Sequence, residues 1–119
     1  MNTLLGFGAM TAIGLSFSPA DATAQGIKVY ISVDMEGITG VVNWEEVNET
    51  GKDYDYFRRM MSKEANAAVE GALAAGATGI VVRDAHGSAR NILPDLLSEK
   101  AKLIRDWSGG PKGMMEGID

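Results

Sequence analysis

Two carboxylate residues, Asp34 and Glu36, follow an apolar stretch of the chain and are separated by a single residue, with a glycine directly after them. Side chains at positions i and i+2 of an extended backbone point the same way, so the two carboxylates can converge on one point. Two anions held so close need a proton or a cation between them. The pair is therefore a candidate metal site. From these residues alone, the alternative is an acidic strand end that faces water.

A histidine offers a third donor. His86 is the only histidine of the chain, and it follows a second apolar stretch and precedes a glycine. Because the sequence contains no cysteine, any metal would have to be held by carboxylates and this histidine. Carboxylate oxygen and imidazole nitrogen suit zinc or a similar divalent ion. The candidate metal ligands are therefore Asp34, Glu36 and His86.

The elements that must position these residues form a strand–helix–strand unit. Residues 27–33 are β-branched and apolar, which predicts a buried strand, and residues 78–83 predict a second one. Between them, residues 54–75 repeat apolar side chains at the i, i+3/i+4, i+7 spacing of one helix face. Asp53 is placed to cap the start of this helix, and Gly76 is placed to end it in a left-handed conformation.

A unit of this spacing has parallel strands and a right-handed crossover. Both strands then deliver their carboxyl ends to the same edge of the sheet, where open α/β folds bind ligands. We therefore expect Asp84 to gather in this crevice with Asp34, Glu36 and His86. The predicted fold class is α/β, a parallel sheet built on this βαβ unit with flanking helices.

The rest of the chain predicts loops and short elements. Residues 38–53 show no periodicity and predict a long loop over the end of the first strand, with one short helical turn. Trp44 in this loop is expected to anchor it to the body of the protein, and the alternative is that Trp44 lines a ligand site. Asn91 is placed to cap a short helix through residues 94–97, and residues 101–105 predict a third strand.

Composition limits the classes of function. The 119 residues are 45% hydrophobic and 23% charged, which fits one globular domain with an ordinary core. The formal net charge is -5, and no cluster of Lys and Arg occurs in the sequence. A surface that binds nucleic acid needs such a cluster, so no nucleic-acid partner is expected.

The first 26 residues differ in kind from the rest of the chain. The apolar residues 4–17 are followed by Ser-Pro and then by Ala22-Thr23-Ala24, which has the small-x-small form of a signal-peptidase site. We expect residues 1–24 to be an export signal and residues 25–119 to be part of a periplasmic or secreted domain. The apolar run is shorter than the ~20 residues of a membrane-spanning helix, so no stable membrane anchor is expected. Signals of this kind usually begin with Lys or Arg, which is missing here, so a cytoplasmic location stays open.

Four segments, taken in order, resemble the bacterial D-aminopeptidase family that is associated with dipeptide transport, the DppA type. They are Ser-Val-Asp-Met-Glu-Gly-Ile-Thr-Gly at 32–40, Glu-Ala-Asn at 64–66, Asp-Ala-His-Gly-Ser at 84–88 and Met-Glu-Gly-Ile-Asp at 115–119. The resemblance runs from Lys28 to the last residue. Members of the family are zinc metallopeptidases with two metal ions, and they are much longer than this chain. The resemblance thus implies the N-terminal, incomplete part of a larger three-layer α/β domain.

The resemblance also implies roles for individual residues. Asp34 would bridge two zinc ions, and Glu36 and His86 would bind one of them. The remaining ligands, a further histidine and a glutamate, and the catalytic histidine would lie downstream of this chain. The implied reaction is release of N-terminal D-amino acids from short peptides by a water that the two zinc ions activate. The full-length protein would be a homo-oligomer.

Two interpretations from other classes remain. An apolar strand followed by Asp34-x-Glu36-Gly37-x-Thr39 also resembles the start of haloacid-dehalogenase-type magnesium-dependent phosphatases. Glu at the second acidic position departs from their pattern, and His86 would have no role. The other interpretation is a fragment that binds metal without catalysis, which fits a chain with only part of the site.

Overall fold

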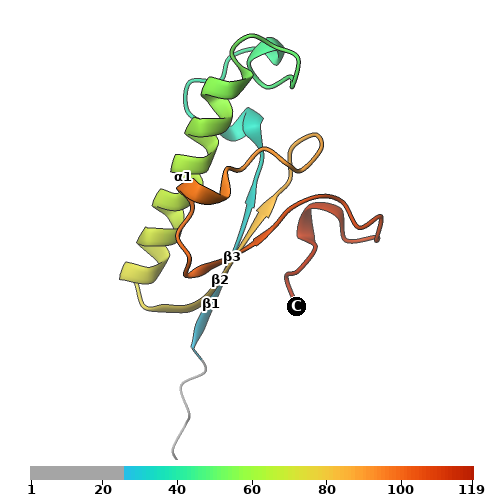
Figure 1. Ribbon diagram of the computed structural model, residues 1–119. Coiled ribbons are helices and arrows are strands. Elements are labelled where there is room, and N and C mark those ends of the chain that lie inside the picture. Colours follow the sequence, from blue (N-terminus) through green and yellow to red (C-terminus); the bar gives the residue numbers. More distant parts are fainter. Residues whose placement is uncertain (1–25) are drawn as a thin grey trace, which may run out of the picture.

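The computed structural model describes residues 26–119 and shows a parallel β-sheet with one long α-helix along one of its faces (Figure 1). The sheet has three strands in the order β1-β2-β3, and both neighbouring pairs are parallel. The elements are β1 (Ile27–Val33), α1 (Tyr54–Ala74), β2 (Ala77–Asp84) and β3 (Ala101–Ile104). The predicted α/β class and the βαβ unit are confirmed.

The register of the first two strands brings their carboxyl ends to the same level. Val33, the last residue of β1, pairs with Asp84, the last residue of β2. The N–H of Ala85 then donates to the carbonyl of Val33 over 2.9 Å, so the strands stay together one step beyond the ladder. The two chain segments that follow the strands therefore begin side by side.

The hydrophobic core lies between α1 and one face of the sheet. The helix contributes Phe57, Met61, Ala65 and Val69, which are spaced four residues apart and are all buried. Val33, Ile80 and Val82 face them from the strands. Full burial of a side chain such as Val or Met contributes about 1.5–3 kcal/mol. This packing holds the sheet rigidly beneath the loops at its carboxyl edge.

The two predicted ends of the helix have different outcomes. Gly76 has φ +91°, the left-handed conformation that glycine adopts without steric cost, so the predicted helix stop is confirmed. Asp53 occupies the N-cap position, but its side chain makes no capping hydrogen bond. The predicted side-chain cap at Asp53 is therefore wrong. The residue has a helical backbone conformation there, with φ −100° and ψ −3°, unlike the extended backbone of a capping residue.

The second face of the sheet carries no α-helix among residues 26–119. The sequence predicts flanking helices, and the described part of the chain has one, α1. The chain after β3 crosses this face, as Figure 1 shows in red. The single hydroxyl proton of Tyr30 is shared between the carbonyls of Met114 and Glu116, whose oxygens lie 2.9 and 2.8 Å from the hydroxyl oxygen. The buried guanidinium of Arg83 lies 4.4 Å from the centre of the Trp107 ring. These contacts attach the irregular segment to the sheet.

The short elements are 3-10 turns, at Met35–Gly37, Trp44–Glu46, Pro94–Leu96 and Gly113–Met115. Leu93, and not Asn91, precedes the turn at Pro94–Leu96, so the predicted capping role of Asn91 is wrong. No helix of the described part has the length and apolarity needed to span a bilayer. The predicted export signal, residues 1–24, lies outside the residues that the structure describes.

Candidate metal centre

Alternating burial aims the two carboxylates outward at the end of β1. Val33 and Met35 are buried in the core, at 8% and 0% exposure, whereas Asp34 and Glu36 between and after them are not. Asp34 keeps an extended backbone, and the 3-10 turn Met35–Gly37 then carries Glu36. The apolar residues of this stretch thus fix the direction of the acidic ones.

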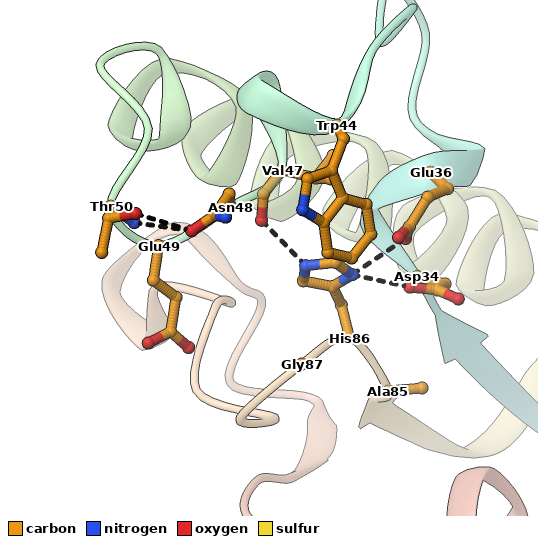
Figure 2. A pocket seen from close by; sticks show the side chains of 10 residues that line it. All are labelled: Asp34, Glu36, Trp44, Val47, Asn48, Glu49, Thr50, Ala85, His86 and Gly87. Carbon is orange, nitrogen blue, oxygen red and sulfur yellow. Dashed lines mark hydrogen bonds and ion pairs between the residues drawn. The ribbon is translucent and has the colours of Figure 1, made fainter.

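The structure brings all three predicted ligands together, as Figure 2 shows. Nδ1 of His86 lies 3.0 Å from Oδ1 of Asp34 and 2.8 Å from Oε2 of Glu36. One donor atom from each residue falls within 4.8 Å of the others. The His86 side chain is 7% exposed, while those of Asp34 and Glu36 are 43% and 46% exposed. The cluster is therefore supported from below by a buried imidazole and is open to solvent on the carboxylate side.

The far nitrogen of the imidazole is held by the loop above it. Nε2 of His86 lies 2.9 Å from the carbonyl oxygen of Val47, which can only accept, so Nε2 carries a proton. This bond aims Nδ1 at the two carboxylates. Histidines that bind metal usually donate their second N–H to a carbonyl or carboxylate in this way, which fixes the tautomer and ring orientation. One imidazole nitrogen and two carboxylates, held with such a backbone partner, fit zinc.

The three groups shift one another's pKa values. Burial raises the pKa of Asp34, and the hydrogen bond and charge of Glu36 raise it further against the opposing effect of His86. Burial acts to raise the pKa of Glu36, but hydrogen bonds from Asp34 and from the backbone, with the charge of His86, lower it on balance. Burial acts to lower the pKa of His86, but the Val47 carbonyl and the two carboxylates raise it on balance. The cluster attracts positive charge, as two adjacent anions must.

A cavity of about 440 Å³ opens beside the cluster and is lined by both sheet-edge loops. Trp44 forms one wall; its ring centre lies 6.4 Å from that of His86, and the residue is 63% exposed. The expectation that Trp44 anchors its loop is therefore wrong, and the alternative, that it lines the site, holds. Val47, at 1% exposure, inserts into the core in its place. The Glu46 carboxylate accepts from the N–H groups of Val42 and Asn43 over 2.7 and 3.1 Å, which makes the turn Trp44–Glu46 locally stable.

The expectation that Asp84 joins the crevice is wrong. Asp84 is 0% exposed and lies on the helix-facing side of β2, as Val82 does two residues earlier. Its carboxylate accepts from the backbone N–H groups of Asn91 and Ile92 over 2.6 and 2.7 Å. The residue therefore holds the loop that follows β2 and offers no atom to the metal centre.

An α/β domain with clustered carboxylates and an imidazole at the carboxyl edge of a parallel sheet has the features of a metal-dependent enzyme domain. The sequence profile of the D-aminopeptidase family matches residues 27–119. The chain belongs to this family, which confirms the resemblance seen in its motifs and does not favour the phosphatase interpretation.

Two relatives show how much of the family's length this chain covers. A D-aminopeptidase of Bacillus subtilis (strain 168) is 37% identical over 95 residues, covering 78% of this chain and 34% of the relative. The solved structure described as the Zn-dependent D-aminopeptidase DppA from Bacillus subtilis, a self-compartmentalizing protease, aligns with a TM-score of 0.74 and 35% identity. The alignment covers 78% of this chain and 34% of that one. The chain therefore spans about a third of the length of these relatives.

Proposed function

We propose that this chain supplies part of the zinc site of an aminopeptidase that releases N-terminal D-amino acids from short peptides. The observation that carries the proposal is the convergence of Asp34, Glu36 and His86, with His86 Nδ1 at 3.0 and 2.8 Å from the two carboxylates. These residues lie in the segment that matches the D-aminopeptidase family. The Bacillus subtilis structure is described as Zn-dependent, which favours zinc for the centre.

Each residue has a defined task at this centre. His86 offers Nδ1 as a ligand while Val47 holds its Nε2–H. Glu36 and Asp34 would each offer carboxylate oxygen as a ligand. Bound zinc supplies an activated water and polarises the substrate carbonyl. A second ion would need further ligands, because residues 26–119 hold one cluster of three potential ligands, and it is the one formed by Asp34, Glu36 and His86.

The cavity beside the centre is suited to the end of a peptide. Its wall includes a further carboxylate, Glu49, which is not one of the three proposed ligands and attracts the free amine of the first residue. The exposed indole of Trp44 provides an apolar surface for the side chain of that residue. Amine recognition at the metal centre restricts cleavage to the first peptide bond.

The test is hydrolysis of D-alanyl dipeptides with added zinc, by the 119-residue chain and by a version extended to the length of its relatives. We expect the extended protein to turn over and the short chain to be slower by at least about 100-fold, because losing a second ion costs about 3 kcal/mol of transition-state stabilisation or more. Equal turnover by the short chain and the extended protein would show that the proposed zinc site is wrong. Hydrolysis of phosphate esters would support the phosphatase, and zinc binding without turnover by either protein would support the non-catalytic fragment.

We also propose export and assembly for the whole protein. The apolar run and the Ala22-Thr23-Ala24 motif support cleavage after Ala24, so the mature chain isolated from cells should begin at Gln25. Mass spectrometry of the mature protein checks this, and an intact Met1 on folded cytoplasmic protein would contradict it. The Bacillus subtilis DppA is described as self-compartmentalizing, which favours a homo-oligomer here at full length.

A further inference from the structure

A buried polar network lies directly beneath the metal centre, and Asn91 is at its middle. The Asn91 side chain is 0% exposed and uses every part of its amide. Nδ2 donates to Oδ1 of Asp84 over 2.8 Å and to the main-chain carbonyl of His86 over 2.6 Å. Oδ1 accepts from the hydroxyl of Tyr54 over 2.5 Å. One amide thus joins strand β2, helix α1 and the loop that carries the histidine.

All members of this network are satisfied. Asp84 accepts from Asn91 twice and from the Ile92 N–H once, so its buried charge is balanced by N–H groups. Among the described residues, the buried side-chain atoms without a partner belong to Arg83 and to no member of this network. A fully satisfied buried network is rigid, because each group has one favourable orientation. Asn91 is therefore a fixed point against which the loop can be held.

The loop needs such support. His86 starts a tight turn, closed by the Ala89 N–H, which donates to the His86 carbonyl over 2.7 Å. Ala89 has φ +56°, a left-handed conformation that disfavours residues with a side chain. The turn is thus strained at Ala89, and the second donor on the same carbonyl, the Asn91 amide, stabilises it from below.

We propose that Asn91 is a positioning residue for His86, and that it sets the affinity of the centre for a divalent cation without touching the ion. The inference rests on the proposed metal centre. His86 is held at two points: Val47 fixes the ring through Nε2, and Asn91 fixes the main chain from which the ring projects. Loss of the second point lets Nδ1 move relative to the carboxylates, and outer partners of metal ligands affect affinity strongly for this reason.

The experiment compares Zn²⁺ affinity, by isothermal titration of the 119-residue chain, with the free energy of unfolding in urea. Asn91→Ala is expected to weaken zinc binding about tenfold. Ser62→Ala is the matched control. Ser62 is equally buried on α1 and its hydroxyl accepts from the Leu93 N–H over 2.9 Å, but it makes no hydrogen bond to His86. The control should lose stability and keep its zinc affinity.

A second variant and a second measurement guard against loss of the fold. Tyr54→Phe removes only the hydroxyl that orients Asn91. If Asn91→Ala does not fold, Tyr54→Phe takes its place, and its zinc affinity is compared with that of Ser62→Ala. Because His86 is the only histidine, its ring nitrogens give one set of ¹⁵N NMR signals without assignment. In Ser62→Ala those signals should still show one tautomer, with the proton on Nε2. In Asn91→Ala they should no longer show this single tautomer. If zinc affinity falls equally in Asn91→Ala and in Ser62→Ala, the role of Asn91 is overturned but the metal centre is not. If the unsubstituted chain does not bind zinc, the metal centre is overturned and the role of Asn91 with it.

Discussion

Replacing His86 with alanine is expected to reduce the zinc affinity of this chain by at least about 100-fold, because even changes to the partners of a metal ligand cost about 10–100-fold. His86 supplies the only nitrogen donor of the cluster, and its Nδ1 lies within 3.0 Å of both carboxylates. The remaining Asp34 and Glu36 form an oxygen-only pair, which suits hard ions such as Mg²⁺ better than zinc. Isothermal titration with Zn²⁺ measures the loss, and a parallel titration with Mg²⁺ should change far less.

The matched control for this experiment is Glu45→Gln. Glu45 is an exposed carboxylate of the neighbouring turn Trp44–Glu46 and takes no part in the cluster. Its replacement by Gln removes one exposed charge near the cluster without touching a candidate ligand, and it should leave zinc affinity within about twofold, since exposed charges act weakly through water. An unchanged affinity in His86→Ala would place the ion elsewhere on the chain.

The convergence of the three candidate ligands could be predicted because it depends on two strong rules. Alternation along an extended chain puts Asp34 on the side opposite Val33. Glu36 also turns away from the core because Met35 before it is buried, but it does so from a 3-10 turn and not from the extended backbone that the sequence predicts. The parallel order of a βαβ unit then brings the end of β2, and with it His86, to the same edge. Both rules act through apolar patterns that are visible in the sequence. Helix α1 was predicted to within one residue for the same reason, since its buried face repeats every turn.

The supports of the centre could not be predicted, because they depend on tertiary contacts without a sequence signature. The Val47 carbonyl is a backbone atom, and any residue at that position would present it. Asp84 was assigned to the crevice since it shares the strand end with Asp34, but the alternation that turns Asp34 out turns Asp84 toward the helix. Its partner Asn91 was expected to cap a helix because Asn is a common capping residue. Only the fold shows that its side chain binds Asp84 and His86.

The second large effect is expected at Asp84 itself. Asp84→Ala removes the acceptor of two N–H groups of Asn91 and of the Ile92 N–H, at distances of 2.6 to 2.8 Å. A buried donor left without a partner costs about 1–3 kcal/mol, so the three together should lower the free energy of unfolding by at least about 3 kcal/mol. That is a large share of the roughly 5–15 kcal/mol typical of a domain, and urea unfolding followed by circular dichroism measures it.

Asp55→Ala is the control, because its carboxylate is 85% exposed and pairs with Arg58 only at 3.8 Å. Such a surface pair should contribute about 0.5 kcal/mol or less. The same variants distinguish a structural role of Asp84 from a role as a metal ligand. If Asp84 were a metal ligand, its loss would weaken zinc binding as strongly as loss of His86, even under conditions where the variant is folded. We expect instead a large loss of stability and a smaller loss of zinc affinity, because Asp84 acts on the ion only through Asn91 and the His86 main chain.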